Sequence, residues 1–160
     1  MANPPTAAWN EGEKAPAFSL ASSNGQKISL ASLKGNPIVL YFYPKDDTPG
    51  CTVEAKAFQS KLKEFSRLGV TVLGVSPDSL ESHCKFVDKF GLAFQLLSDP
   101  DHAVAEKYGV WVEKNMYGKK YWGVQRSTFL IDANGRLAKI WPKVKPEGHA
   151  EEVLDAVKAL

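Results

Sequence analysis

The 160-residue sequence predicts a single α/β domain in which helices cover both faces of a central mixed sheet. A continuous apolar run at residues 38–43 and a second, largely apolar run at residues 70–75 are typical of central strands that are buried on both faces. Each run precedes a segment with the three-to-four-residue apolar spacing of an amphipathic helix. One domain over residues 1–160 fits this length, because no linker or internal repeat divides the sequence.

The N-terminal part is expected to add a hairpin to this sheet. Residues 1–12, rich in proline, alanine and asparagine, are predicted to form a loose lead-in. Residues 17–20 and 27–30 alternate as strands do, and the turn residues Ser23–Asn24–Gly25 lie between them.

The helices are predicted from apolar spacing and from the residues that end them. One continuous helix is expected over residues 51–68, which Gly69 would end. A second helix would present Leu80, Cys84 and Val87 as one apolar face. The remaining expectations are a strand at 96–97, a helix at 101–108, an exposed loop at 114–120, strands at 127–132 and 136–141 joined by a turn, and a closing helix at 147–160. This order is the layout of a thioredoxin-like fold with an N-terminal hairpin extension.

Composition and charge exclude several classes of function. Twenty basic and 18 acidic residues give a net charge of +2 without a concentrated basic segment, which argues against nucleic-acid binding. No apolar run reaches the roughly 18–20 residues of a membrane span, and no export signal is recognisable, so we expect a cytoplasmic protein. The three histidines lack metal-ligand spacing with the cysteines, and no phosphate-binding or dinucleotide motif occurs. We therefore expect no cofactor and no metal.

The segment from Tyr43 to Cys51 is the candidate site. It leaves the end of a buried strand at Pro44 and enters a helix, which is where α/β proteins tend to bind ligands. Thr48 has the position of a helix cap, and Cys51 falls in the first turn, where free N–H groups and the helix dipole favour a thiolate. A lone cysteine there could equally be a small buried hydrophobe. Glu54 would oppose a nearby thiolate, so we expect its side chain to point away.

Residues 41–52 resemble the active-site signature of peroxiredoxins, and more narrowly that of the bacterioferritin-comigratory-protein, or Q-type, subfamily. Pro44, Thr48 and Cys51 match the family pattern residue by residue. Further matching stretches are 82–83, 85–86, 96–99 and 126–132, so the resemblance extends from about Glu13 to the last helix.

The resemblance implies a thiol peroxidase that reduces hydrogen peroxide and organic hydroperoxides. Cys51 would attack the hydroperoxide and become a sulfenic acid. Thr48 would offer its hydroxyl to the thiolate or the peroxide, Pro44 would shield the nucleophile from water, and Arg126 would be the catalytic arginine. The resemblance also implies a monomer that is reduced by thioredoxin or a glutaredoxin-type partner.

The second cysteine leaves alternatives open. The commonest Q-type pattern has a resolving cysteine five residues after the first, but here that position is Lys56. Cys84 could instead resolve Cys51 as an intramolecular disulfide after local opening, or it could be a core residue of its helix. In the latter case the protein would be a one-cysteine peroxidase reduced by an external thiol. The neighbouring His83 is interpreted as a solvated or capping histidine.

Two other classes of function compete with the peroxidase. In one, Cys51 oxidises and passes the disulfide to a partner, as in a peroxide sensor or redox relay. In the other, the chain is a thioredoxin-fold binding module without peroxidase activity. A dithiol oxidoreductase is disfavoured, because the sequence has no Cys-x-x-Cys.

Overall fold

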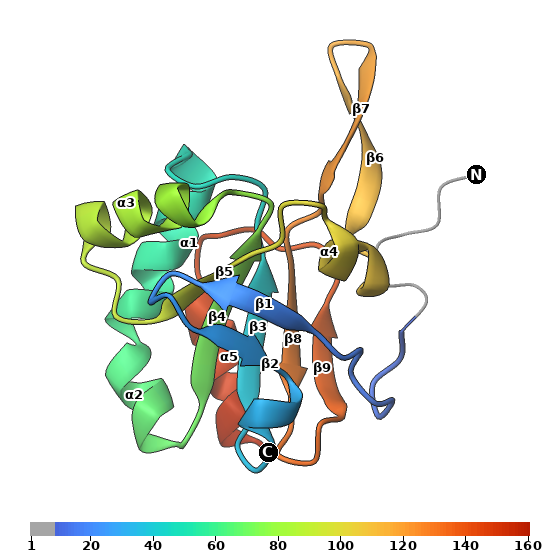
Figure 1. Ribbon diagram of the computed structural model, residues 1–160. Coiled ribbons are helices and arrows are strands. Elements are labelled where there is room, and N and C mark those ends of the chain that lie inside the picture. Colours follow the sequence, from blue (N-terminus) through green and yellow to red (C-terminus); the bar gives the residue numbers. More distant parts are fainter. Residues whose placement is uncertain (1–8) are drawn as a thin grey trace.

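The computed structural model describes residues 9–160, in which a seven-stranded mixed sheet has helices on both faces (Figure 1). The strand order is β2-β1-β5-β4-β3-β8-β9, and β6 and β7 form a separate two-stranded ribbon. The strands are β1 Ser19–Ser22, β2 Lys27–Ser29, β3 Ile38–Phe42, β4 Thr71–Ser76, β5 Gln95–Ser98, β6 Trp111–Met116, β7 Lys119–Val124, β8 Ser127–Ile131 and β9 Leu137–Trp141. The helices are α1 Pro49–Ser60, α2 Leu62–Arg67, α3 Leu80–Phe90, α4 Ala103–Lys107 and α5 His149–Lys158, with a short 3-10 turn, η1, at Ala31–Leu33.

The predicted central strands are confirmed. β3 pairs in parallel with β4 and antiparallel with β8, and every residue of β3 is buried. Successive side chains of β3 alternate between two cores. Val39 and Tyr41 pack with residues of α1, α3 and α5, whereas Leu40 and Phe42 pack with α4 and the N-terminal segment. The uniform apolar composition of β3 therefore follows from a cover on each face of the sheet.

The two predicted hairpins of the main sheet are also present. β1 pairs antiparallel with β2, and β8 with β9. Of the expected lead-in, residues 1–8 lie outside the described residues. Gly12 donates its N–H to the carbonyl of Leu137, and the indole of Trp9 donates to the carbonyl of Lys107. The described end of this segment is thereby attached to the domain.

Three local predictions are wrong. The continuous helix over residues 51–68 is divided at Lys61, which leaves the helical backbone conformation between α1 and α2. The expected loop at 114–120 is part of the β6–β7 ribbon, which projects from the body of the domain (Figure 1). Residues 114–120 are polar or exposed, so the apolar alternation that predicts a strand is missing there.

The third correction concerns α3. Leu80 and Cys84 are exposed, and the residues buried by this helix are His83 and Phe86. His83, interpreted as solvated or capping, is instead wholly inaccessible to solvent. The prediction failed because the inward face of α3 carries a polar residue whose partners come from elsewhere in the fold.

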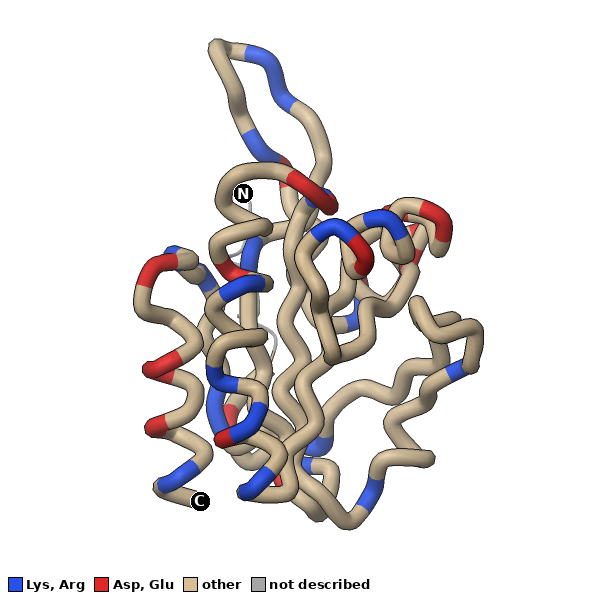
Figure 2. Tube along the Cα trace, turned by 90° about the vertical axis from the view of Figure 1, so that its left-hand side faces the viewer, with Lys and Arg blue, Asp and Glu red and all other residues tan. Residues whose placement is uncertain are grey.

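Charged residues of both signs are spread over the surface. Figure 2 shows acidic and basic residues interspersed along the helices, and the β6–β7 ribbon carries Lys114, Lys119 and Lys120. Within residues 9–160, the longest apolar helical stretches are too short to cross a bilayer.

Candidate active site

The start of α1 places Cys51 at the edge of the sheet. β3 ends at Phe42, a loop follows, and Pro49 is the first residue of α1. Thr48 is the N-cap residue, as predicted, but its hydroxyl donates to the carbonyl of Lys45 at 2.9 Å rather than accepting from a helix N–H. Cys51 lies in the first turn and is only 2% exposed. Its sulfur therefore lies near the positive end of the helix dipole and is largely shielded from bulk water.

Arg126 reaches Cys51 from the neighbouring strand. The pairing of Phe42 with Ser127 brings the residue before β8 across the end of β3, where the loop to α1 begins. Arg126 Nη2 donates to Cys51 Sγ at 3.3 Å, and Nη1 donates to Glu54 Oε1 at 2.7 Å. The planar guanidinium thus spans two acceptors that lie on consecutive turns of one helix.

Glu54 points into the site, contrary to expectation. Its side chain is 1% exposed, and Oε2 has no hydrogen-bond partner among the described residues. Burial raises the pKa of Glu54 to about 7, against the opposing effect of Arg126. Burial alone would lower the pKa of Arg126, but Glu54 and Cys51 raise it. The expectation failed because it considered only repulsion from Cys51 and not the cation that lies between the two groups.

Gly50 allows this close approach. A Cβ atom built on Gly50 would lie 3.1 Å from Arg126 Nη2, closer than about nine in ten real contacts of that kind. No role for Gly50 was predicted from the sequence. The available signal was a glycine within the first turn of a helix, where it lowers helix stability and so needs another reason to be present.

The remaining predicted residues, Pro44, Thr48 and Cys84, form no hydrogen bond to the sulfur of Cys51. Pro44 and Thr48 are partly buried in the loop that precedes α1. Cys84 lies on α3, where its thiol is exposed and donates to the carbonyl of Ser23 at 3.4 Å. The structure thus brings together Cys51, Arg126 and the unpredicted Glu54, and leaves Cys84 outside this group.

A thiol in the first turn of a helix, beside a fixed arginine on a thioredoxin-like sheet, defines a class of peroxide-reacting proteins. The profile of the AhpC/TSA family matches residues 12–140, and the chain belongs to this family. It is a peroxiredoxin, and therefore a thiol peroxidase.

Its relatives narrow the assignment to the Bcp, or Q-type, group. The chain is 50% identical to peroxiredoxin Bcp of Bacillus subtilis over 147 residues, which cover 92% of this chain and 94% of the relative. Peroxiredoxin Q of Xanthomonas campestris superposes with a TM-score of 0.85 at 48% identity, covering 89% of this chain and 90% of that one. A structure concerned with alkyl peroxide reduction by the bacterioferritin comigratory protein of the same organism has a TM-score of 0.88 at 45% identity, covering 94% and 98%. The predicted resemblance and fold class are both confirmed.

Proposed function

We propose that Cys51 is the nucleophile that reduces hydrogen peroxide and alkyl hydroperoxides in this protein. The observation that carries the proposal is the Arg126 guanidinium, held by Glu54 with one N–H directed at Cys51 Sγ. The thiolate attacks the terminal oxygen of the hydroperoxide, the O–O bond breaks, and water or an alcohol leaves after taking up a proton. Cys51 is thereby oxidised to a sulfenic acid.

The neighbouring residues stabilise negative charge at the reacting atoms and limit the access of water to the Cys51 sulfur. Arg126 stabilises the thiolate and the negative charge that develops on the leaving oxygen. The Thr48 hydroxyl can both donate and accept, so it can turn from the Lys45 carbonyl toward a bound peroxide. Pro44 limits the access of water to the sulfur.

Cys84 is the proposed resolving cysteine. Its thiol attacks the sulfur of oxidised Cys51, an S–S bond forms and water leaves. Both thiols must move for this step, because Cys51 is buried and Cys84 is directed at Ser23. Structures of the Xanthomonas protein exist with either of two cysteines changed to serine, and those two cysteines are farther apart in sequence than Cys51 and Cys84 are here. The spacing in that relative therefore does not by itself identify Cys84 as the resolving cysteine. The role of Cys84 is therefore proposed from its own place on α3.

The proposed cycle closes with a dithiol reductant. Thioredoxin or a glutaredoxin-type protein would reduce the disulfide, with the enzyme acting as a cytoplasmic monomer. The reductant supplies two electrons and leaves as a disulfide.

A coupled assay tests the proposal. With thioredoxin, thioredoxin reductase and NADPH, added peroxide should cause sustained NADPH oxidation, and the Cys51→Ser variant should show none. A single stoichiometric oxidation of the wild-type protein would instead indicate a sensor or relay.

The second cysteine is tested separately. Non-reducing mass spectrometry after one equivalent of peroxide should detect a Cys51–Cys84 disulfide in the wild type and none in Cys84→Ser. A wild-type protein without this disulfide, but with undiminished turnover, would be a one-cysteine peroxidase.

A further inference from the structure

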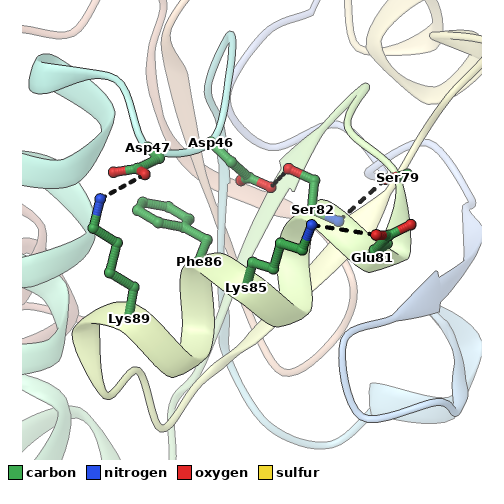
Figure 3. Close-up of a pocket in the computed structure, with 8 residues that line it drawn as sticks. All are labelled: Asp46, Asp47, Ser79, Glu81, Ser82, Lys85, Phe86 and Lys89. Carbon is green, nitrogen blue, oxygen red and sulfur yellow. Dashed lines mark hydrogen bonds and ion pairs between the residues drawn. The ribbon is translucent and has the colours of Figure 1, made fainter.

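The buried carboxylate of Asp46 joins the loop before Cys51 to helix α3 (Figure 3). Its side chain is only 3% exposed. Oδ2 accepts from Ser82 Oγ at 2.8 Å and lies 2.7 Å from His83 Nδ1, while Oδ1 accepts from the Tyr43 hydroxyl at 2.5 Å. The backbone N–H of Asp46 donates to Asp78 Oδ2 at 2.8 Å. Asp46 is thus held by contacts from its own loop, from α3 and from the segment between β4 and α3.

His83 completes the link from the α3 side. Its ring is fully buried, and Nε2 lies 3.0 Å from the carbonyl oxygen of Leu97 in β5. Because a carbonyl can only accept, the proton is on Nε2. Nδ1 lies opposite the Asp46 carboxylate, so each ring nitrogen faces an oxygen acceptor. Removing Asp46 would leave this buried group without its partner.

The loop beyond Asp46 has a backbone conformation that needs such an anchor. Asp47 has a φ of 57°, in the left-handed region that side chains other than glycine rarely adopt. Backbone conformations of this kind persist where flanking contacts hold them. Thr48, the N-cap of α1, follows directly, and Cys51 lies three residues later. The position of Cys51 beside Arg126 therefore depends on the anchored turn.

The same anchor restrains the second cysteine. Ser82 and His83, which contact Asp46, immediately precede Cys84 on α3. A cavity of about 320 Å³ lies between the loop and this helix, so the two are not continuously packed. In Figure 3 the link from Asp46 to Ser82 and the exposed ion pair between Asp47 and Lys89 both cross this junction.

We propose that Asp46 and His83 are positioning residues for the peroxidase cycle, which together form a latch between the loop and α3. The latch keeps Cys51 beside Arg126 for attack on peroxide. It also keeps the first turns of α3 folded, and so delays the movement of Cys84 toward oxidised Cys51. Loss of the latch therefore slows the first chemical step and speeds the second. The second half of this inference rests on the proposed resolving role of Cys84.

Asp46→Asn tests the latch, because it removes the charge with little change of shape. We expect the reaction of the reduced enzyme with hydrogen peroxide, followed by stopped flow, to slow about tenfold. Disulfide formation, followed by acid quenching and mass spectrometry, should become several-fold faster. Amide hydrogen exchange in residues 80–84 of the reduced protein should also accelerate.

Lys89→Gln is the matched control, because it removes an ion pair between the same loop and helix that is solvent-exposed. It should change each rate by less than about twofold. Ser82→Ala, which removes one of the bonds to Asp46, should shift all three measurements in the same directions by smaller amounts. This variant decides the question if Asp46→Asn does not fold.

The proposal is overturned if the peroxide and disulfide rates fall together, if neither changes, or if Lys89→Gln has the same effect as Asp46→Asn. A wild-type enzyme that forms no Cys51–Cys84 disulfide would remove the resolving role of Cys84 instead. The peroxide rate and the exchange of α3 would then decide the latch by themselves.

Discussion

The two cysteines of this protein occupy opposite environments. Cys51 is buried at the start of α1, beside the Arg126 guanidinium and near the helix dipole. Cys84 is exposed on α3 and has a backbone carbonyl, that of Ser23, as its neighbour. Exposure alone would make Cys84 the more reactive thiol. In the proposed mechanism, nearby positive charge and fixed geometry, rather than access, make Cys51 the sulfur that reacts with peroxide.

The largest expected effect is on the stability of the folded protein, which should depend on pH because Glu54 is buried beside Cys51. Glu54 has a pKa of about 7 in the folded protein, above the ordinary value of 4.5. Between pH 4.5 and about 7, Glu54 carries a proton in the folded protein but not in the unfolded chain, so the free energy of unfolding falls as pH rises. The loss approaches roughly 3 kcal/mol above pH 7.

Glu54→Gln removes this titration. Relative to the wild type, the variant should therefore be more stable near pH 8 than near pH 5, as measured by urea unfolding at both pH values. Burial lowers the pKa of His149, which gives an opposite trend, but that contribution cancels in the difference between the two proteins. If the stability difference between Glu54→Gln and the wild type were the same at both pH values, the raised pKa of the buried Glu54 carboxyl would be contradicted.

Removing the guanidinium should make Cys51 more like Cys84. Arg126→Ala is expected to slow the reaction of Cys51 with peroxide at least tenfold, because the cation that stabilises the thiolate and the leaving oxygen is lost. Stopped-flow kinetics with hydrogen peroxide provide the measurement. Arg126→Lys should recover little, since an ammonium cannot span Cys51 and Glu54 together. An unchanged rate for Arg126→Ala would exclude this residue from the site.

Displacing the guanidinium should have a smaller effect. Gly50→Ala places a methyl group 3.1 Å from Arg126 Nη2, so the side chain must shift away from Cys51. We expect the peroxide rate to fall about fivefold with little change in melting temperature. Equal rates in the variant and the wild type would show that the site tolerates this shift.

The Thr48 hydroxyl should contribute least. Thr48→Val keeps the shape of the side chain but removes the donor to Lys45 and to a bound peroxide. The expected loss of rate is about threefold, typical of one hydrogen bond, and Thr48→Ser should restore most of it. A Thr48→Val enzyme with full activity would leave the hydroxyl without a catalytic role.

The elements predicted correctly from the sequence are those with a clear local pattern, such as an apolar strand or a recognisable turn. β3 is uniformly apolar, β4 is largely apolar, and the turn between β8 and β9 has its characteristic residues, so these were placed correctly. Glu54 was expected to point away from Cys51 because of charge repulsion, and His83 was interpreted as solvated or capping, but both side chains are buried. Their partners, Arg126 and Asp46, are distant in sequence, and only the folded chain brings them together.

The central claim is that the buried thiol, and not the exposed one, reacts with peroxide. The most direct measurement treats reduced wild-type protein with one equivalent of hydrogen peroxide in the presence of excess dimedone, followed by peptide mass spectrometry. We expect the dimedone adduct to form on Cys51 first. Cys84 should be oxidised before that only as part of a disulfide with Cys51. Adducts that form on Cys84 as fast as on Cys51, or only on Cys84, would contradict it.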